Sequence, residues 1–211
     1  MKRDSRDHEN PDQRSRILDE AETLFSTKGF NSVTLRDIAE PLGLRHSALY
    51  YHFPGGKEAL FAEVMERNIR RHGAGLSAKM DASDGSLRGK LFGASEWLIS
   101  QPPLDLLRMS QTDLKALAPD QARMIMDLVY TLILRKLQDA FESAATKAET
   151  GPCDAGLLAG GVLGLVESLH AAPVSVVGRK KEDMARDLID VLLKGIEYTG
   201  IKEDEHVRSR T

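Results

Sequence analysis

A short stretch of the sequence brings together side chains that can bind nucleic acid. The run RHSALYYHF at residues 45–53 contains one arginine, two histidines, a serine and two tyrosines, and no carboxylate. Because an acidic side chain repels phosphate, whereas these donors and amphipathic rings can reach base edges and the DNA backbone, the pattern is typical of a DNA-recognition helix. The candidate contact residues in this run are Arg45, His46, Ser47, Tyr50, Tyr51 and His52.

Residues on either side of this run can hold the DNA backbone. Thr34 followed three residues later by Asp37 is the pattern of a capping box, and the N–H groups of such a helix start attract anions. Arg36, in the first turn of that helix, can reach a guanine edge or a phosphate. Lys57 follows two glycines and marks a second helix start. We therefore expect two backbone-binding helix starts that flank the recognition helix.

The elements that must position these side chains are helices. Apolar residues at helical spacing predict a long helix over 11–28 and two short helices over 34–42 and 45–52. Two short helices joined by a glycine-containing turn and packed on a longer first helix form a helix-turn-helix, which presents its second helix to a major groove. The sequence thus predicts such a motif between Val33 and Leu60.

The remainder of the chain also has helical periodicity, and no strand pattern competes with it. We expect an all-α fold of about nine helices, with an N-terminal three-helix helix-turn-helix domain and a larger C-terminal helical domain. The expected later helices cover 86–100, 104–117, 119–149, 154–171 and 182–198. The expected segments are a mobile arm over 1–10, the helix-turn-helix domain over 11–56, a connecting helix over 57–80, a ligand-binding and dimerisation domain over 81–200 and a tail over 201–211.

Ordered matches over residues 17–65 carry a family resemblance. They are Ala21 and Phe25, Gly29-Phe30, Thr34, Asp37-Ile38-Ala39, Gly43, the run Leu49-Tyr50-Tyr51-His52-Phe53 and the run Lys57-Glu58-Ala59-Leu60. This part of the chain resembles the DNA-binding domain of the tetracycline-repressor (TetR) family. The spacing Phe53-Pro54-Gly55-Gly56-Lys57 is one residue longer than the commonest form and resembles a branch that includes regulators of drug resistance.

The resemblance assigns roles to individual positions. It implies phosphate contacts from Thr34, Tyr50 and Lys57. It also places a further set nearest the bases, namely Arg36, His46, Ser47, Tyr51 and His52. Two positions depart from the family pattern, since Arg45 stands where a capping serine is usual and Ala48 stands where a hydroxyl residue is common. Which of Arg45, His46, Ser47 and Tyr51 reads bases is therefore left open.

The C-terminal helices are expected to bind a ligand and a second copy of the chain. Larger side chains in a region otherwise built of Leu and Ala suggest a site for a small hydrophobic effector, although a core role is the usual one for such residues. These ligand candidates are Trp97, Met109, Met126, Tyr130 and His170. The eighth and ninth expected helices, 154–171 and 182–198, carry small residues and a Leu/Ile stripe and form the expected homodimer surface, as is usual in the family. The resulting hypothesis is a transcriptional regulator, a ligand-released repressor that binds a pseudo-palindromic double-stranded DNA operator as a dimer.

Composition and missing motifs bound the alternatives. The formal net charge of −3 gives no overall basic excess, so any DNA contact must be local. Because the sequence has no HExxH, P-loop, GxSxG or dinucleotide-binding glycine run, we expect no enzyme, cofactor or metal. A charged N-terminus, no apolar run of membrane-spanning length and the single Cys153 favour the cytoplasm and no membrane partner. The rival hypotheses are a ligand-binding or adaptor protein of the same fold that binds a protein instead of DNA, and an enzyme with an accessory helix-turn-helix.

Overall fold

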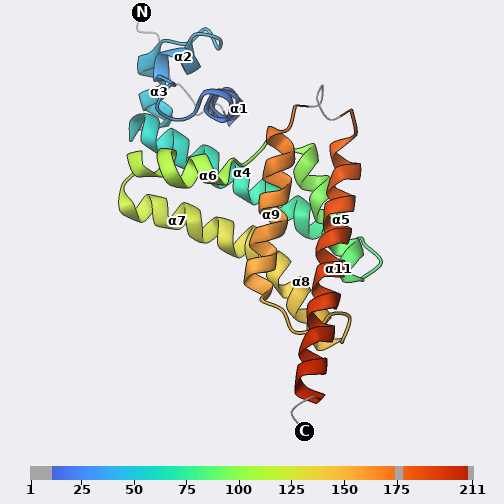
Figure 1. The fold of residues 1–211 in the computed structure, drawn as a ribbon. Helices are drawn as coiled ribbons and strands as arrows, with labels where there is room; N and C mark the ends of the chain where they lie inside the picture. Colours follow the sequence, from blue (N-terminus) through green and yellow to red (C-terminus); the bar gives the residue numbers. More distant parts are fainter. Residues whose placement is uncertain (1–10, 174–177, 209–211) are drawn as a thin grey trace, which may run out of the picture. The chain divides into compact units, whose positions relative to one another are not determined.

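The computed structural model describes residues 11–173 and 178–208, and all secondary structure within these ranges is helical (Figure 1). The all-α prediction is thus confirmed, while the expected arm over 1–10 lies outside the described residues. The α-helices are α1 (Pro11–Lys28), α2 (Leu35–Ala39), α3 (His46–His52), α4 (Gly56–Asp81), α5 (Leu87–Ser100), α6 (Leu106–Arg108), α7 (Pro119–Val129), α8 (Arg135–Thr146), α9 (Ala155–Ala171) and α11 (Lys181–Arg208).

Irregular turns extend two of these helices. A π-helical turn over Met109–Asp113 and a 3-10 turn over Leu114–Ala116 continue α6, and a π-helical turn over Tyr130–Leu134 joins α7 to α8. With each turn counted as part of the helix it continues, α1 to α6, the joined α7 and α8, α9 and α11 make nine helices in the described residues, as expected. Of the helices described, none is long and apolar enough to cross a membrane.

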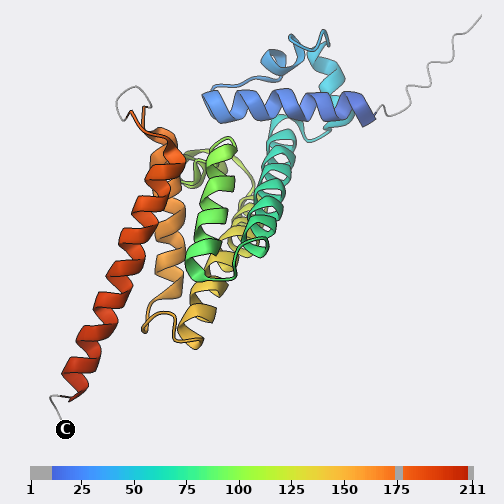
Figure 2. The ribbon, with the colours of Figure 1, turned by 90° about the vertical axis from the view of Figure 1, so that its right-hand side faces the viewer.

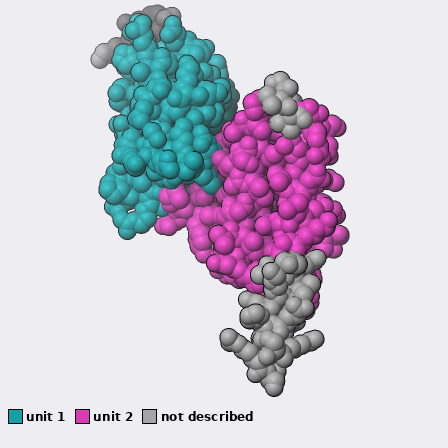
Figure 3. All heavy atoms as spheres, in the orientation of Figure 1, with its two compact units in different colours: residues 1–68, 105–125 teal, residues 69–104, 126–211 magenta. Residues whose placement is uncertain are grey.

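The chain divides into two compact units (Figure 3). Unit 1 comprises residues 1–68 and 105–125, and unit 2 comprises residues 69–104 and 126–211. Unit 1 therefore contains α1 to α3 and the first half of α4, together with α6, its irregular turns and the start of α7. Unit 2 contains the remaining helices.

The short helices of unit 1 end where their sequence requires it. Thr34 caps α2, and the helix ends at Ala39, two residues before Pro41. Because Pro41 has no N–H to donate to the carbonyl of Asp37, the α-helical hydrogen bonds end there, and α2 is shorter than the expected 34–42. Gly43 then takes a left-handed φ of +68° in the turn that leads to α3.

Aromatic packing forms the core of unit 1 beneath these helices. The rings of Phe25 and Phe61 meet edge to face with centroids 5.1 Å apart, and Phe30 lies 4.9 Å from Phe61. All three side chains are buried. Rings at these separations gain about 0.5–1.5 kcal/mol per pair beyond the area they bury. This cluster fixes the corner between α1 and α2 on α4.

In unit 2, α4 continues to Asp81 through Gly73 and Gly75, although glycine has a low helix propensity. A Cβ on Gly73 would lie 2.8 Å from the Cβ of Leu132, and one on Gly75 would lie 2.0 Å from the Trp97 ring. The indole Nε1 of Trp97 donates a hydrogen bond of 3.1 Å to the backbone carbonyl of the buried His72. The glycines are therefore positions of close helix approach, and this packing offsets their low helix propensity.

The helices α5, α9 and α11 lie side by side in unit 2 (Figure 2). Arg88 of α5 makes a two-pronged ion pair with Asp190 of α11, with donor–acceptor distances of 2.7 and 2.8 Å. Arg186 of α11 also forms an ion pair with Glu96 of α5. Helix α11 ends at Arg208 instead of near Tyr198, because no proline interrupts the helix between these positions.

Candidate DNA-binding surface

The start of α2 is held by a complete capping box. Oγ1 of Thr34 accepts a hydrogen bond from the backbone N–H of Asp37 at 3.2 Å, and Oδ2 of Asp37 accepts from the backbone N–H and the hydroxyl of Thr34 at 2.8 and 2.7 Å. These bonds from Thr34 lower the pKa of the Asp37 carboxyl. The box orients the first turn of α2, where the outward backbone N–H groups of a helix start can accept an anion.

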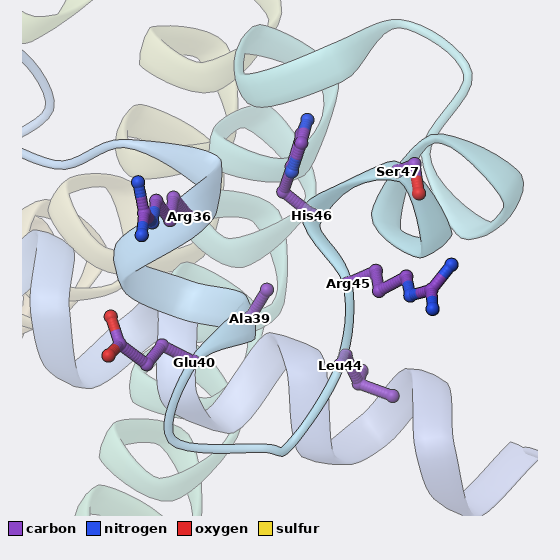
Figure 4. A pocket seen from close by; sticks show the side chains of 7 residues that line it. All are labelled: Arg36, Ala39, Glu40, Leu44, Arg45, His46 and Ser47. Atoms are coloured by element: carbon purple, nitrogen blue, oxygen red, sulfur yellow. The ribbon is translucent and has the colours of Figure 1, made fainter.

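A groove of about 540 Å³ lies between α2 and α3 (Figure 4). Four residues predicted from sequence line it together: Arg36, Arg45, His46 and Ser47. Arg45 takes an extended conformation as the N-cap of α3 and makes no side-chain cap hydrogen bond. The groove thus joins the positive side chains of both short helices on one surface.

Glu40 also lines this groove, and the sequence interpretation did not include it. That interpretation weighed acidic residues only along the recognition helix, where there are none. Glu40 is the C-cap residue of α2. It follows Arg36 by four residues and therefore lies on the same side of the helix. The i, i+4 spacing of Arg36 and Glu40 could have predicted from the sequence that a carboxylate lies beside the basic side chains.

The tyrosines of α3 are exposed. Tyr50 keeps 50% and Tyr51 keeps 60% of its surface accessible, and the ring of Tyr51 meets that of His52 edge to face at 5.3 Å. On the inner side of the same helix, Leu49 and the following Phe53 are buried. The helix therefore has an apolar side in the core and a polar, aromatic side that faces solvent.

Lys57 lies in the first turn of α4, and its ammonium group is directed into unit 1. Nζ donates hydrogen bonds to the backbone carbonyls of Phe30 and Val33 at 3.0 and 2.9 Å. It also lies 4.1 Å from the centroid of the Phe30 ring. Of the residues expected at phosphates, Lys57 is thus the one whose charged end contacts the protein's own backbone.

The ligand candidates do not gather within one unit. Met109 is buried in unit 1, whereas Trp97, Met126, Tyr130 and His170 belong to unit 2. Met126 and Tyr130 are exposed on the surface of unit 2, while Trp97 packs against Gly75.

His170 is half-buried, and its Nε2 lies 3.2 Å from the carbonyl oxygen of Leu98. Burial lowers the pKa of His170, and the nearby charge of Lys181 adds to this, while the Leu98 carbonyl acts in the opposite direction. Within the described ranges, no three His, Cys, Asp or Glu side chains are grouped so that they could hold a metal ion.

The comparisons with known proteins agree with this surface. Residues 17–64 match the family model described as "Bacterial regulatory proteins, tetR family". The matched range contains α2, α3 and every residue of the groove between them. Residues 17–64 belong to the tetR family. The capping box, the groove and the exposed aromatic side of α3 therefore all lie within one tetR-family domain.

Curated relatives are similar to only a minor part of this chain. The transcriptional regulator LmrA of Bacillus subtilis is 38% identical over 78 residues, which are 35% of this chain and 42% of LmrA. IcaR of Staphylococcus aureus, a negative regulator of a biofilm operon, is 46% identical over 44 residues, or 21% of this chain and 24% of IcaR. The chain therefore spans less than half the length of these relatives.

A solved structure extends the similarity of fold to most of the chain. AibR, in complex with isovaleryl coenzyme A and operator DNA, aligns with a TM-score of 0.70 and 17% sequence identity. The alignment covers 86% of this chain and 97% of the AibR chain. The helices that follow the tetR-family domain thus share the fold of the AibR chain.

Proposed function

We propose that this protein is a DNA-binding transcriptional repressor that acts as a homodimer and releases its operator when a small hydrophobic effector binds. The observation that carries the proposal is the groove between α2 and α3, where Arg36, Arg45, His46 and Ser47 lie together within a tetR-family domain. Side chains of these types supply the bonds that hold DNA phosphates and read guanine or adenine edges. The proposed location of this repressor is the cytoplasm.

The proposed contacts fall into two groups. Arg36, His46, Ser47, Tyr51 and His52 lie nearest the bases, and Thr34 and Tyr50 contact the backbone. Arg45 reaches either a base edge or a phosphate. Both tyrosines and the groove residues other than Ala39 and Leu44 are accessible, so DNA can approach without rearrangement of the core. Phosphate contacts position the protein, and base contacts specify the sequence. Loss of a phosphate contact is therefore expected to weaken binding to all DNA sequences, whereas loss of a base contact is expected to reduce sequence specificity.

The proposed dimer forms through α9 and α11. An unusual apolar surface supports this: Leu157 on α9 and Val191 on α11 are 72% and 67% exposed. On α9, a Cβ added to Gly160, Gly161 or Gly164 meets no atom of the chain within 4 Å. A second copy related by a two-fold axis can approach closely at these glycines, and would set two recognition helices in successive major grooves, about 34–36 Å apart.

The effector is proposed to bind in unit 2, where four of the five ligand candidates lie, namely Trp97, Met126, Tyr130 and His170. The AibR structure supports an effector for this fold, because AibR is there in complex with both isovaleryl coenzyme A and operator DNA. An effector that prefers the conformation with weaker DNA affinity releases the operator by its differential affinity, about 1–3 kcal/mol of coupling free energy.

The test is titration of the purified protein into fluorescent DNA from upstream of its own gene, at several salt concentrations. Specific binding is expected to weaken steeply as salt rises. Arg45→Ala is expected to weaken it by about 1–3 kcal/mol. Lys136→Ala, which removes the same charge from an exposed site on α8, is the matched control and leaves the affinity unchanged.

Two results would overturn the proposal. One is the absence of any DNA binding at low salt. The other is binding that neither salt nor Arg45→Ala affects, which would favour a protein-binding adaptor of the same fold. Addition of hydrophobic candidate effectors to the bound complex then tests release directly.

A further inference from the structure

We propose that Lys57 is a positioning residue of the DNA-binding unit, which fixes the entry of α2 through the backbone and does not bind a phosphate itself. The inference rests on the proposed DNA-binding function, and it assigns a role to one side chain of that surface. It separates Lys57 from exposed basic residues such as Arg45, whose charged ends are accessible.

The surroundings of the ammonium group carry the inference. An ammonium has three N–H donors. Two of them are taken by the carbonyl oxygens of Phe30 and Val33, at 3.0 and 2.9 Å. The face of the Phe30 ring lies 4.1 Å away, within the range of a cation–π contact. Two of the three donors of Lys57 are thus taken by backbone oxygens, and a ring face lies against the ammonium group.

The two carbonyls border the segment that leads into α2. The backbone N–H of Val33 donates to the carbonyl of Phe30 at 3.4 Å, so Phe30 closes a turn directly before the N-cap Thr34. Val33 is fully buried. By binding both carbonyls, Lys57 holds the ends of this turn, and with them the direction in which the capping box and Arg36 are presented.

The position of Lys57 in the chain links this turn to the recognition helix. The backbone N–H of Gly56 donates to the carbonyl of Phe53 at 2.9 Å, and Gly56 takes a φ of +71°, which closes the turn between α3 and α4. Lys57 follows immediately. One side chain therefore ties the residues that follow α3 to the residues that precede α2, and so fixes the two short helices relative to each other on α4.

The Phe30 ring is itself held in place. It packs against Phe61 of α4 and Phe25 of α1, with centroids 4.9 and 6.0 Å away. The platform beneath the ammonium is therefore part of the buried aromatic cluster of unit 1. Replacement of Lys57 is therefore expected to lower both the stability of this unit and its DNA affinity.

The experiment compares Lys57→Met with Arg45→Met and wild type in two measurements, thermal unfolding of the full chain and DNA affinity over a salt series. Removal of one phosphate contact lowers the slope of log K against log salt by about 0.9. For Lys57→Met we expect an unchanged slope, an affinity reduced by the same factor at every salt concentration, and a Tm lower by roughly 4 °C, as expected for the loss of more than 1 kcal/mol in a chain of this size. Lys115→Met, at an exposed position of unit 1, serves as the control for Tm.

A fall in the salt slope of Lys57→Met overturns the proposal, as does an unchanged Tm. If Lys57→Met does not fold, Lys57→Arg gives the decision, because it keeps the charge but replaces the compact ammonium by a planar fork. The positioning role predicts that Lys57→Arg lowers both the Tm and the DNA affinity. A phosphate-binding role predicts a wild-type Tm and a wild-type affinity, and that result would contradict the proposal. If wild-type protein binds no DNA, the proposed function fails, and the Tm of Lys57→Met still shows whether the side chain fixes this turn.

Discussion

The carboxylate of Asp113 accepts a hydrogen bond of 3.2 Å from the backbone N–H of Phe30, 83 positions earlier in the sequence. Asp113 is 4% exposed and also pairs with Arg108, whose guanidinium donates to the carbonyls of Phe25 and Ser26 at the end of α1. All of these groups lie in unit 1. Helix α6 and the π-helical turn after it thus satisfy backbone groups at the corner between α1 and α2.

We expect Asp113→Ala to destabilise the protein by about 1–3 kcal/mol, because it leaves the buried N–H of Phe30 without an acceptor. Urea unfolding of the full chain measures the difference. Asp120→Ala is the matched control, since Asp120 is 93% exposed in its ion pair with Arg123, and such a pair contributes little. Equal stabilities of the two variants would show that the Asp113 bond contributes nothing.

Thr34→Ala is expected to raise the pKa of Asp37 toward its ordinary value, because hydrogen bonds from Thr34 are the largest cause that lowers it. A carboxyl whose pKa is lower in the folded state stabilises the protein above its unfolded-state pKa, and this contribution is lost as pH falls through the folded-state pKa. NMR titration of the Asp37 carboxyl measures the shift, and Thr34→Ser should preserve the low pKa. A low pKa that persists in Thr34→Ala would contradict the assignment.

Gly75→Ala should destabilise unit 2, because the new Cβ would lie 2.0–2.5 Å from three atoms of the Trp97 ring. Overpacking of this kind costs about 1–3 kcal/mol. Trp97 is the single tryptophan of the chain, so its fluorescence reports directly on the displaced ring. Ala74→Ser, at the exposed neighbouring position, is expected to leave both the emission and the stability unchanged.

Gly164→Ala tests the proposed dimer surface. Within one chain the added Cβ meets nothing within 4 Å, so the helix of a monomer should be unchanged or slightly more stable. Against a closely packed second copy, overpacking of about 1–3 kcal/mol is expected to weaken the dimer by roughly 5- to 150-fold. Sedimentation measures the dimer dissociation constant, and an unchanged constant would mean that α9 does not meet a partner at Gly164.

His170 should make the stability of unit 2 depend on pH. Burial lowers its folded-state pKa, so below the ordinary histidine value of about 6.5 the unfolded chain binds more protons than the folded one. Stability is therefore expected to fall as pH drops from 6.5 through the lowered pKa, and His170→Gln should reduce this dependence. Thermal unfolding at pH 7.5 and 5.5 compares the two proteins, and identical pH dependence would exclude His170 as the cause.

Local signals in the sequence determined the elements of the candidate site. Helical periodicity with a proline at its start and a glycine after its end predicted α1 at its observed bounds, and the Thr34–Asp37 spacing predicted the capping box of α2. These features depend on residues within one or two turns of each other, so sequence alone is sufficient to find them. The ordered matches around Gly43 likewise predicted the family, because the short helices and their turn are encoded contiguously.

Only the tertiary structure decided features that depend on distant partners. Gly73 and Gly75 look like helix breakers in sequence, yet α4 continues because Leu132 and Trp97 pack against the space they leave. In the same way, a lysine at a helix start predicts a phosphate contact. The carbonyls that accept hydrogen bonds from Lys57 nevertheless belong to Val33 and Phe30, 24 and 27 positions earlier in the sequence. Sequence specifies which groups a residue carries, whereas the partners that satisfy or occupy those groups are set by the packing of the whole unit.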